Sequence, residues 1–237
     1  MPSQVWGRSP QEAYKNPYEY AVQDQFVREA RAILKKLNEK LQKYSMKFHR
    51  DDCSEKKAIW MLQLDALDSL RDALEALTAK KHRITAKSFR DIIETLDLAA
   101  FFHSSTNGSK KELKKWYKDE VILHKVYRDF IKKTEGEKLA VRKKDLYKSL
   151  SRFTHRTYCA LLDGYGLGKN DMLWHDGYDE TGFLILPQTT SVYYAELANL
   201  ISEFLHEVST RNLLTKKEVQ EIVNTSLESN TVVRRLS

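Results

Sequence analysis

The sequence predicts an all-α fold, a multi-helix up-down bundle. Only 8 of its 237 residues are Gly and only 4 are Pro, so the residues that most often interrupt regular structure are scarce. Apolar residues recur at spacings of three and four over long stretches, which is the period of an amphipathic helix. A hydrophobic content of 41% is sufficient for a chain of this length to bury a core.

Seven helices are expected. Two Ser/Thr-x-x-Glu sequences, Ser109 to Glu112 and Thr215 to Glu218, are typical of capping boxes and predict the starts of the fourth and seventh helices. The Gly-rich segment 164–188 is expected to hold at most one short β-hairpin, formed by Met172–His175 and Phe183–Leu186. The helices are predicted over residues 26–48, 59–77, 86–102, 109–135, 140–163, 190–210 and from 216 onward.

The chain is expected to form one domain, because no internal repeat or low-complexity linker divides it. Residues 1–17 form a polar, Pro-bearing segment that we expect to be a flexible lead-in. Residues 18–228 are expected to form the single helical bundle, and residues 229–237 a frayed tail.

The charge distribution favours a polyanionic partner. Forty basic residues oppose 33 acidic ones, for a net charge of +7, and the basic residues crowd the segment 110–156. Such a surplus suits RNA. Two isolated Cys residues and the lack of an apolar run near the roughly 20 residues that span a bilayer predict a cytoplasmic protein without a membrane anchor.

The predicted fifth helix carries the most suggestive side chains. At about 100° per residue, Lys148, Arg152 and His155 lie within one narrow arc, opposite the apolar stripe of that helix. A histidine can transfer protons near neutral pH, while Lys or Arg stabilises charge that grows on phosphate oxygens. These three residues are therefore candidate catalytic groups for cleaving RNA without a metal. The competing interpretation is a solvated basic face with an ordinary histidine.

The same segment resembles a known family. Leu146-Tyr-Lys-Ser-Leu-Ser-Arg-Phe-Thr-His155 is similar to the Tyr-Arg-x-Leu-Ser-x-x-x-His pattern of bacterial HEPN-like helical proteins, a group that includes abortive-infection and other defence proteins. Ser69–Glu75 and His124-x-x-x-Arg128 also resemble helices of that group. The resemblance implies a HEPN-like bundle that acts in bacterial stress or phage defence, as a homodimer and a metal-independent ribonuclease.

The chain departs from the pattern of the active members, which carry an Arg, four to six intervening residues and a His. Here Lys148 stands seven residues before His155, and Lys lacks the planar fork with which Arg binds phosphate. Two functions therefore stay open. One is an endoribonuclease that uses His155 with Lys148 and Arg152, and the other is a non-catalytic RNA- or protein-binding module of a defence or toxin–antitoxin system.

Further residues are candidates for RNA contact, and none is expected to bind a metal or cofactor. A di-metal bundle needs two Glu-x-x-His motifs with two more carboxylates, and Glu203-x-x-His206 is the single one. Basic side chains next to aromatic ones suit RNA by charge and stacking. The candidate RNA-binding residues are Arg156, Lys144, Lys115, Lys118 and His175.

Overall fold

A computed structural model describes residues 20–44, 47–158, 161, 165–167, 173–175 and 186–229, and it confirms the predicted all-α class. The predicted lead-in and all but the first residue of the predicted tail lie outside these residues. The described elements are α2 (Tyr20–Gln42), α3 (Glu55–Thr78), α4 (His82–His103), α5 (Asn107–Trp116), α6 (His124–Glu135), α7 (Glu137–Thr154), β1 (Tyr165–Leu167), β2 (Leu173–His175), α9 (Leu186–Thr210) and α10 (Lys216–Asn224).

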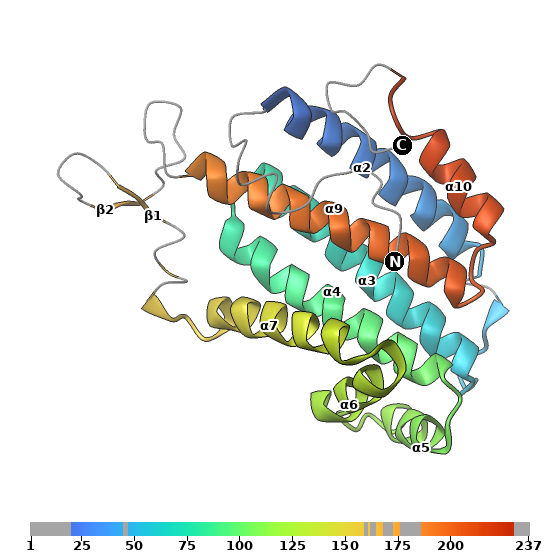
Figure 1. Ribbon diagram of the computed structural model, residues 1–237. Helices are drawn as coiled ribbons and strands as arrows, with labels where there is room; N and C mark the ends of the chain where they lie inside the picture. Colours follow the sequence, from blue (N-terminus) through green and yellow to red (C-terminus); the bar gives the residue numbers. More distant parts are fainter. Residues whose placement is uncertain are drawn as a thin grey trace.

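The core lies among α2, α3, α4 and α9, which run alongside one another (Figure 1). Three residues join α3 to α4, and Lys80 among them adopts a left-handed conformation with φ 58°. So short a connection makes the two helices antiparallel neighbours. The apolar stripes that predicted these helices form the core. Its largest fully buried side chains include Leu37, Leu70, Phe89 and Phe204.

The ends of several helices are fixed by their own side chains. Thr215 accepts a hydrogen bond from the Glu218 N–H, and the Glu218 carboxylate accepts one from the Thr215 N–H, so the predicted capping box of α10 is confirmed. Ser54 caps α3 in a similar way. The first helix ends earlier than predicted from its apolar stripe, because α2 ends at Gln42. Phe48, the last residue of that stripe, packs its ring against Trp60.

The single fourth helix predicted over residues 109–135 is wrong, because the chain forms two helices there. Thr106 caps α5 by accepting from the Ser109 N–H, so the helix begins before the predicted capping box. Asp119 then adopts φ 64°, a left-handed conformation that ends the helix. The residues that follow form neither helix nor strand until α6 begins at His124. Here Ile122 is buried while Val121 and Leu123 are exposed.

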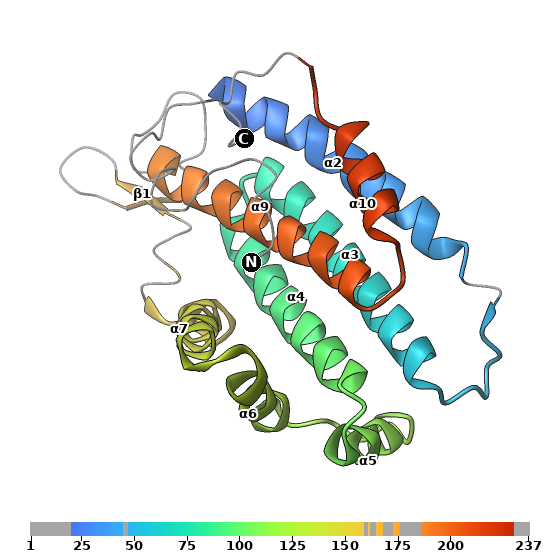
Figure 2. The same ribbon diagram turned by 45° about the vertical axis from the view of Figure 1, so that its right-hand side comes forward.

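Helices α5, α6 and α7 follow one another along one flank of α4, away from α2 and α10 (Figure 2). Gly136 is the one residue between α6 and α7. Its backbone torsions, φ 89° and ψ 160°, belong to a region that is essentially restricted to glycine. The two helices therefore meet at a sharp corner, and both contact α4.

One short β-hairpin was expected in the segment 164–188, and one is present. Strand β1 pairs antiparallel with β2, with Gly166 opposite Trp174. Residues 173–175 of the predicted strand Met172–His175 therefore pair with residues 165–167, and Met172 lies outside the described part of the chain. The predicted partner, Phe183–Leu186, is wrong at its last residue, where α9 begins, and its other residues lie outside the described part of the chain. Among the described helices, none is both long and apolar enough to cross a membrane.

Candidate functional site

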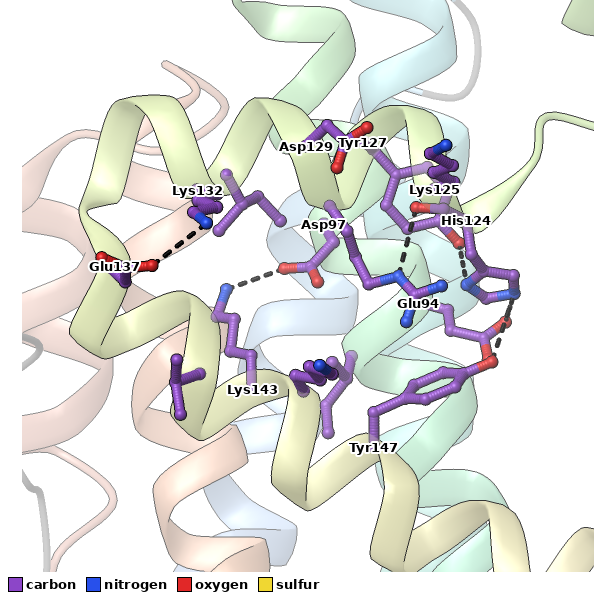
Figure 3. Close-up of a pocket in the computed structure, with 15 residues that line it drawn as sticks. Glu94, Asp97, His124, Lys125, Tyr127, Asp129, Lys132, Glu137, Lys143 and Tyr147 are labelled. Atoms are coloured by element: carbon purple, nitrogen blue, oxygen red, sulfur yellow. Dashed lines mark hydrogen bonds and ion pairs between the residues drawn. The ribbon is translucent and has the colours of Figure 1, made fainter.

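A cavity of about 380 Å³ lies between α4, α6 and α7, where the α6–α7 corner meets the flank of α4 (Figure 3). Its floor consists of buried residues, and its rim consists mainly of exposed charged residues. The residues around it are Ile93, Glu94 and Asp97 from α4, then His124, Lys125, Tyr127, Arg128, Asp129, Ile131 and Lys132 from α6, and Glu137, Val141, Lys143, Lys144 and Tyr147 from α7.

The local sequence explains how α6 forms one wall. Tyr127 and Ile131, one turn apart, are buried at 4% and 2% exposure against α4 and α7. His124 and Arg128 occupy the adjacent stripe of the same helix. The helix thus holds apolar groups at the floor of the cavity and polar groups beside them.

A carboxylate on α4 joins the three helices. Glu94 accepts a hydrogen bond from Arg90 Nε at 2.6 Å, one turn away on α4, and its other oxygen lies 2.9 Å from His124 Nε2 on α6. Arg90 also donates to the Tyr147 hydroxyl of α7 at 2.6 Å. Because these contacts reach three helices, they fix the walls of the cavity relative to one another.

Both ring nitrogens of His124 are engaged. Burial lowers the pKa of His124, and Arg128 and Arg90 lower it further while Glu94 opposes them. Burial also raises the pKa of Tyr127, so its hydroxyl stays protonated and donates to His124 Nδ1 at 2.5 Å. The neutral imidazole then donates from Nε2 to Glu94. His124 therefore has no nitrogen left to accept a proton from a substrate in this arrangement.

A second, partly buried network anchors α7. Lys143 Nζ lies 2.7 Å from Asp97 on α4 and 3.2 Å from Glu203 on α9. The Asp97 side chain is only 6% exposed. Burial of a carboxylate is unfavourable unless a cation accompanies it. Lys143 therefore neutralises the base of the cavity, and Figure 3 shows its side chain directed at Asp97.

Three cations of the cavity have no carboxylate partner among the residues that the structure describes: Lys125, Arg128 and Lys144. All three are exposed. The Arg128 guanidinium lies over the Tyr147 ring, 5.4 Å from its centroid, and Arg128 Nε donates to the His124 carbonyl at 3.4 Å. Positive charge is thus concentrated at the rim.

The predicted catalytic residues do not line this cavity. Helix α7 ends at Thr154, so His155 is its C-cap and not part of the predicted helix 140–163. Arg156 then adopts φ 54°, which turns the chain. The predicted stripe is therefore interrupted after Arg152. Lys148, Arg152, His155 and Arg156 are all exposed, and their catalytic and RNA-binding roles stay predictions.

The other predicted RNA-binding residues lie in different places. Lys144 lines the cavity, and it is the one candidate with a described side chain that does so. Lys115 pairs with Glu112 at 2.8 Å, while Lys118 is exposed just after α5. His175 lies in β2 opposite Tyr165, and its side chain is outside the described part of the structure.

Sequence patterns point to some residues of the network but not to their contacts. His124 and Arg128 form a sequence motif, and Tyr147 lies inside the segment that ends at His155. Arg90 and Glu94, four residues apart on α4, gave a signal that was missed: opposite charges at this spacing pair on a helix. Glu203 contacts Lys143, and no group of three or more potential metal ligands occurs in the described residues.

Comparison with protein-family models, with curated proteins and with solved structures gave no match to this chain. The HEPN-like resemblance therefore stays a prediction, and the function is inferred from the geometry of the site.

Proposed function

We propose that this chain is a non-catalytic RNA-binding module, a HEPN-like bundle of bacterial defence that holds RNA on the surface of α5, α6 and α7. The observation that carries the proposal is the rim of the cavity, where Lys125, Arg128 and Lys144 have no carboxylate partner within the described structure. Cations without such partners are available to neutralise phosphates.

The location of the charge supports the same surface. Residues 107–156, which contain α5, α6 and α7, hold sixteen of the 40 Lys and Arg residues but only seven of the 33 Asp and Glu residues. The rest of the chain is slightly acidic. The whole basic surplus therefore lies on the flank that these three helices form along α4. A polyanion attracted to the protein would be steered to this flank.

Binding explains the cavity better than proton transfer does. A general base needs a nitrogen that reaches the substrate proton, whereas Tyr127 and Glu94 engage both nitrogens of His124. The network instead holds Arg128 and Tyr147 in place around the cavity. Groups fixed in this way bind a ligand with a smaller entropic cost.

The binding proposal predicts a strong salt dependence. Fluorescence anisotropy of a labelled single-stranded RNA should show affinity that falls as salt rises, with a slope that decreases by about 0.7 for each phosphate contact removed. Arg128→Gln and Lys144→Gln should each weaken binding and reduce that slope. Lys56→Gln, an exposed lysine on α3, is the matched control and should change neither. Salt-independent binding, or an equal loss in the control, would contradict the proposal.

A ribonuclease centred on His155 is the second candidate. It is favoured by the exposure of His155 at the end of α7, with Lys148 and Arg152 exposed on the preceding turns. The purified protein should then cut RNA in EDTA and leave a cyclic phosphate. His155→Ala should abolish cleavage without lowering the melting temperature, because the side chain is exposed. RNA that stays intact in this assay would rule this candidate out.

A further inference from the structure

The charged groups around the cavity leave a local surplus of positive charge. Of its four carboxylates, Glu94 is paired with Arg90, Asp97 with Lys143 and Glu137 with Lys132. Asp129 is the fourth, exposed on α6. Against it stand the three rim cations, for which the described residues provide no carboxylate partner. The rim of the cavity therefore suits an anionic ligand.

The size and walls of the cavity limit what can enter. About 380 Å³ is within the range of small-ligand pockets and too small for a folded or double-stranded segment. Ile93 and Ile131 form part of its apolar floor, and Val141, half exposed on α7, stands at its edge. The apolar floor suits the sugar or base of one nucleotide, while the charged rim suits its phosphate.

We propose that this cavity receives the terminal nucleotide of an RNA strand and that Arg128, Lys144 and Lys125 hold its phosphate monoester. The inference rests on the proposed RNA binding and specifies which part of the RNA the cavity takes. A monoester carries up to two charges at neutral pH, whereas an internal diester carries one. An Arg fork with nearby lysines suits its oxygens.

The experiment compares RNAs that differ only at one end. A short single-stranded RNA is labelled at its 3′ end and carries either a 5′-phosphate or a 5′-hydroxyl. A second pair is labelled at its 5′ end and carries a 3′-phosphate or a 3′-hydroxyl. The phosphorylated member of one pair should bind about tenfold more tightly, the effect of one added charge-assisted contact. The pair that shows the preference identifies which end enters.

Three variants separate the cavity from the general basic surface. Lys144→Gln should reduce the preference for the phosphorylated end to less than threefold, because one contact with the phosphate is lost. Val141→Trp should remove the preference by filling the cavity while keeping every charge. Lys148→Gln, one turn after Lys144 and outside the cavity, is the control. It should weaken the binding of phosphorylated and hydroxyl RNAs equally and leave the ratio of their affinities unchanged.

Free ligands provide an independent measurement. A nucleoside 5′-monophosphate should displace the phosphorylated RNA, and the corresponding nucleoside should not. Equal affinity for phosphorylated and hydroxyl ends would overturn the terminal-phosphate proposal alone and leave RNA binding intact. Failure of every RNA to bind at low salt would overturn the proposed function and this inference with it.

Discussion

Lys143→Met tests how α7 is held on the bundle. The substitution removes the ammonium group that lies 2.7 Å from Asp97, whose side chain is 6% exposed. Removing one partner of a buried ion pair typically costs about 3 to 5 kcal/mol. Because Lys143 is 18% exposed, we expect the lower end, about 3 kcal/mol. In a chain of this size, each kcal/mol lowers the melting temperature by about 2 to 4 °C, so the expected decrease is about 6 to 12 °C.

The assay is thermal and urea denaturation followed by circular dichroism, with two further variants. Asp97→Leu should lower the free energy of unfolding less than Lys143→Met does, because Lys143 keeps Glu203 at 3.2 Å as a partner. The double variant should recover much of the loss, since an apolar pair replaces a buried ionic one at little cost. Lys144→Met, at an exposed neighbour, is the control. A melting temperature of Lys143→Met equal to that of this control, or a double variant no more stable than Lys143→Met, would show that the ion pair does not hold α7.

Three further predictions concern stability. Burial, with a smaller effect of Lys80, lowers the pKa of His82 to about 4, so the unfolded chain takes up the proton first as the pH falls below 6.5. The free energy of unfolding should therefore decrease by about 2 kcal/mol between pH 7 and pH 5. Urea denaturation of His82→Phe should show a smaller decrease. Thr215→Ala removes the cap of α10 and should cost about 1 kcal/mol, while Thr215→Ser should stay near the wild type in the same melts. Phe204→Ala, at a fully buried position, should cost about 3 to 5 kcal/mol; a loss below 1 kcal/mol would contradict its place in the core.

The bundle could be predicted from sequence because its core helices carry complete apolar stripes. In residues 59–77 and 86–102, apolar side chains recur every three or four positions, and both apolar stripes are buried where α3 and α4 pack. The prediction of one helix over residues 109–135 is wrong because an apolar stripe continues through the break at Asp119. Asp tolerates a left-handed backbone but does not require it, so its presence there did not reveal the break. Likewise, Thr106 and Ser109 are both capable caps. Thr106 caps the helix, and the buried Ser109 hydroxyl donates to the Thr106 carbonyl.

The candidate site could be predicted only in part. The basic segment and the residues His124, Arg128 and Lys144 stand out in the sequence. The network that shapes the cavity does not, because Arg90 contacts Tyr147 across 57 positions of the chain. A helical period relates residues one turn apart and contains no information on which helix lies opposite. The predicted face of Lys148, Arg152 and His155 assumed a helix to residue 163, and a left-handed residue at Arg156 ends that geometry.

Gly136 imposes a constraint on how this protein can change over evolutionary time. The two walls of the cavity, α6 and α7, meet at this one residue, whose torsions only glycine adopts readily. A Cβ atom there would meet no neighbour within 4 Å, so the obstacle to substitution is the torsion and not crowding. The rim lysines can exchange for other cations one at a time. Relatives that keep the cavity should therefore retain glycine at this corner even where the charges around it have drifted.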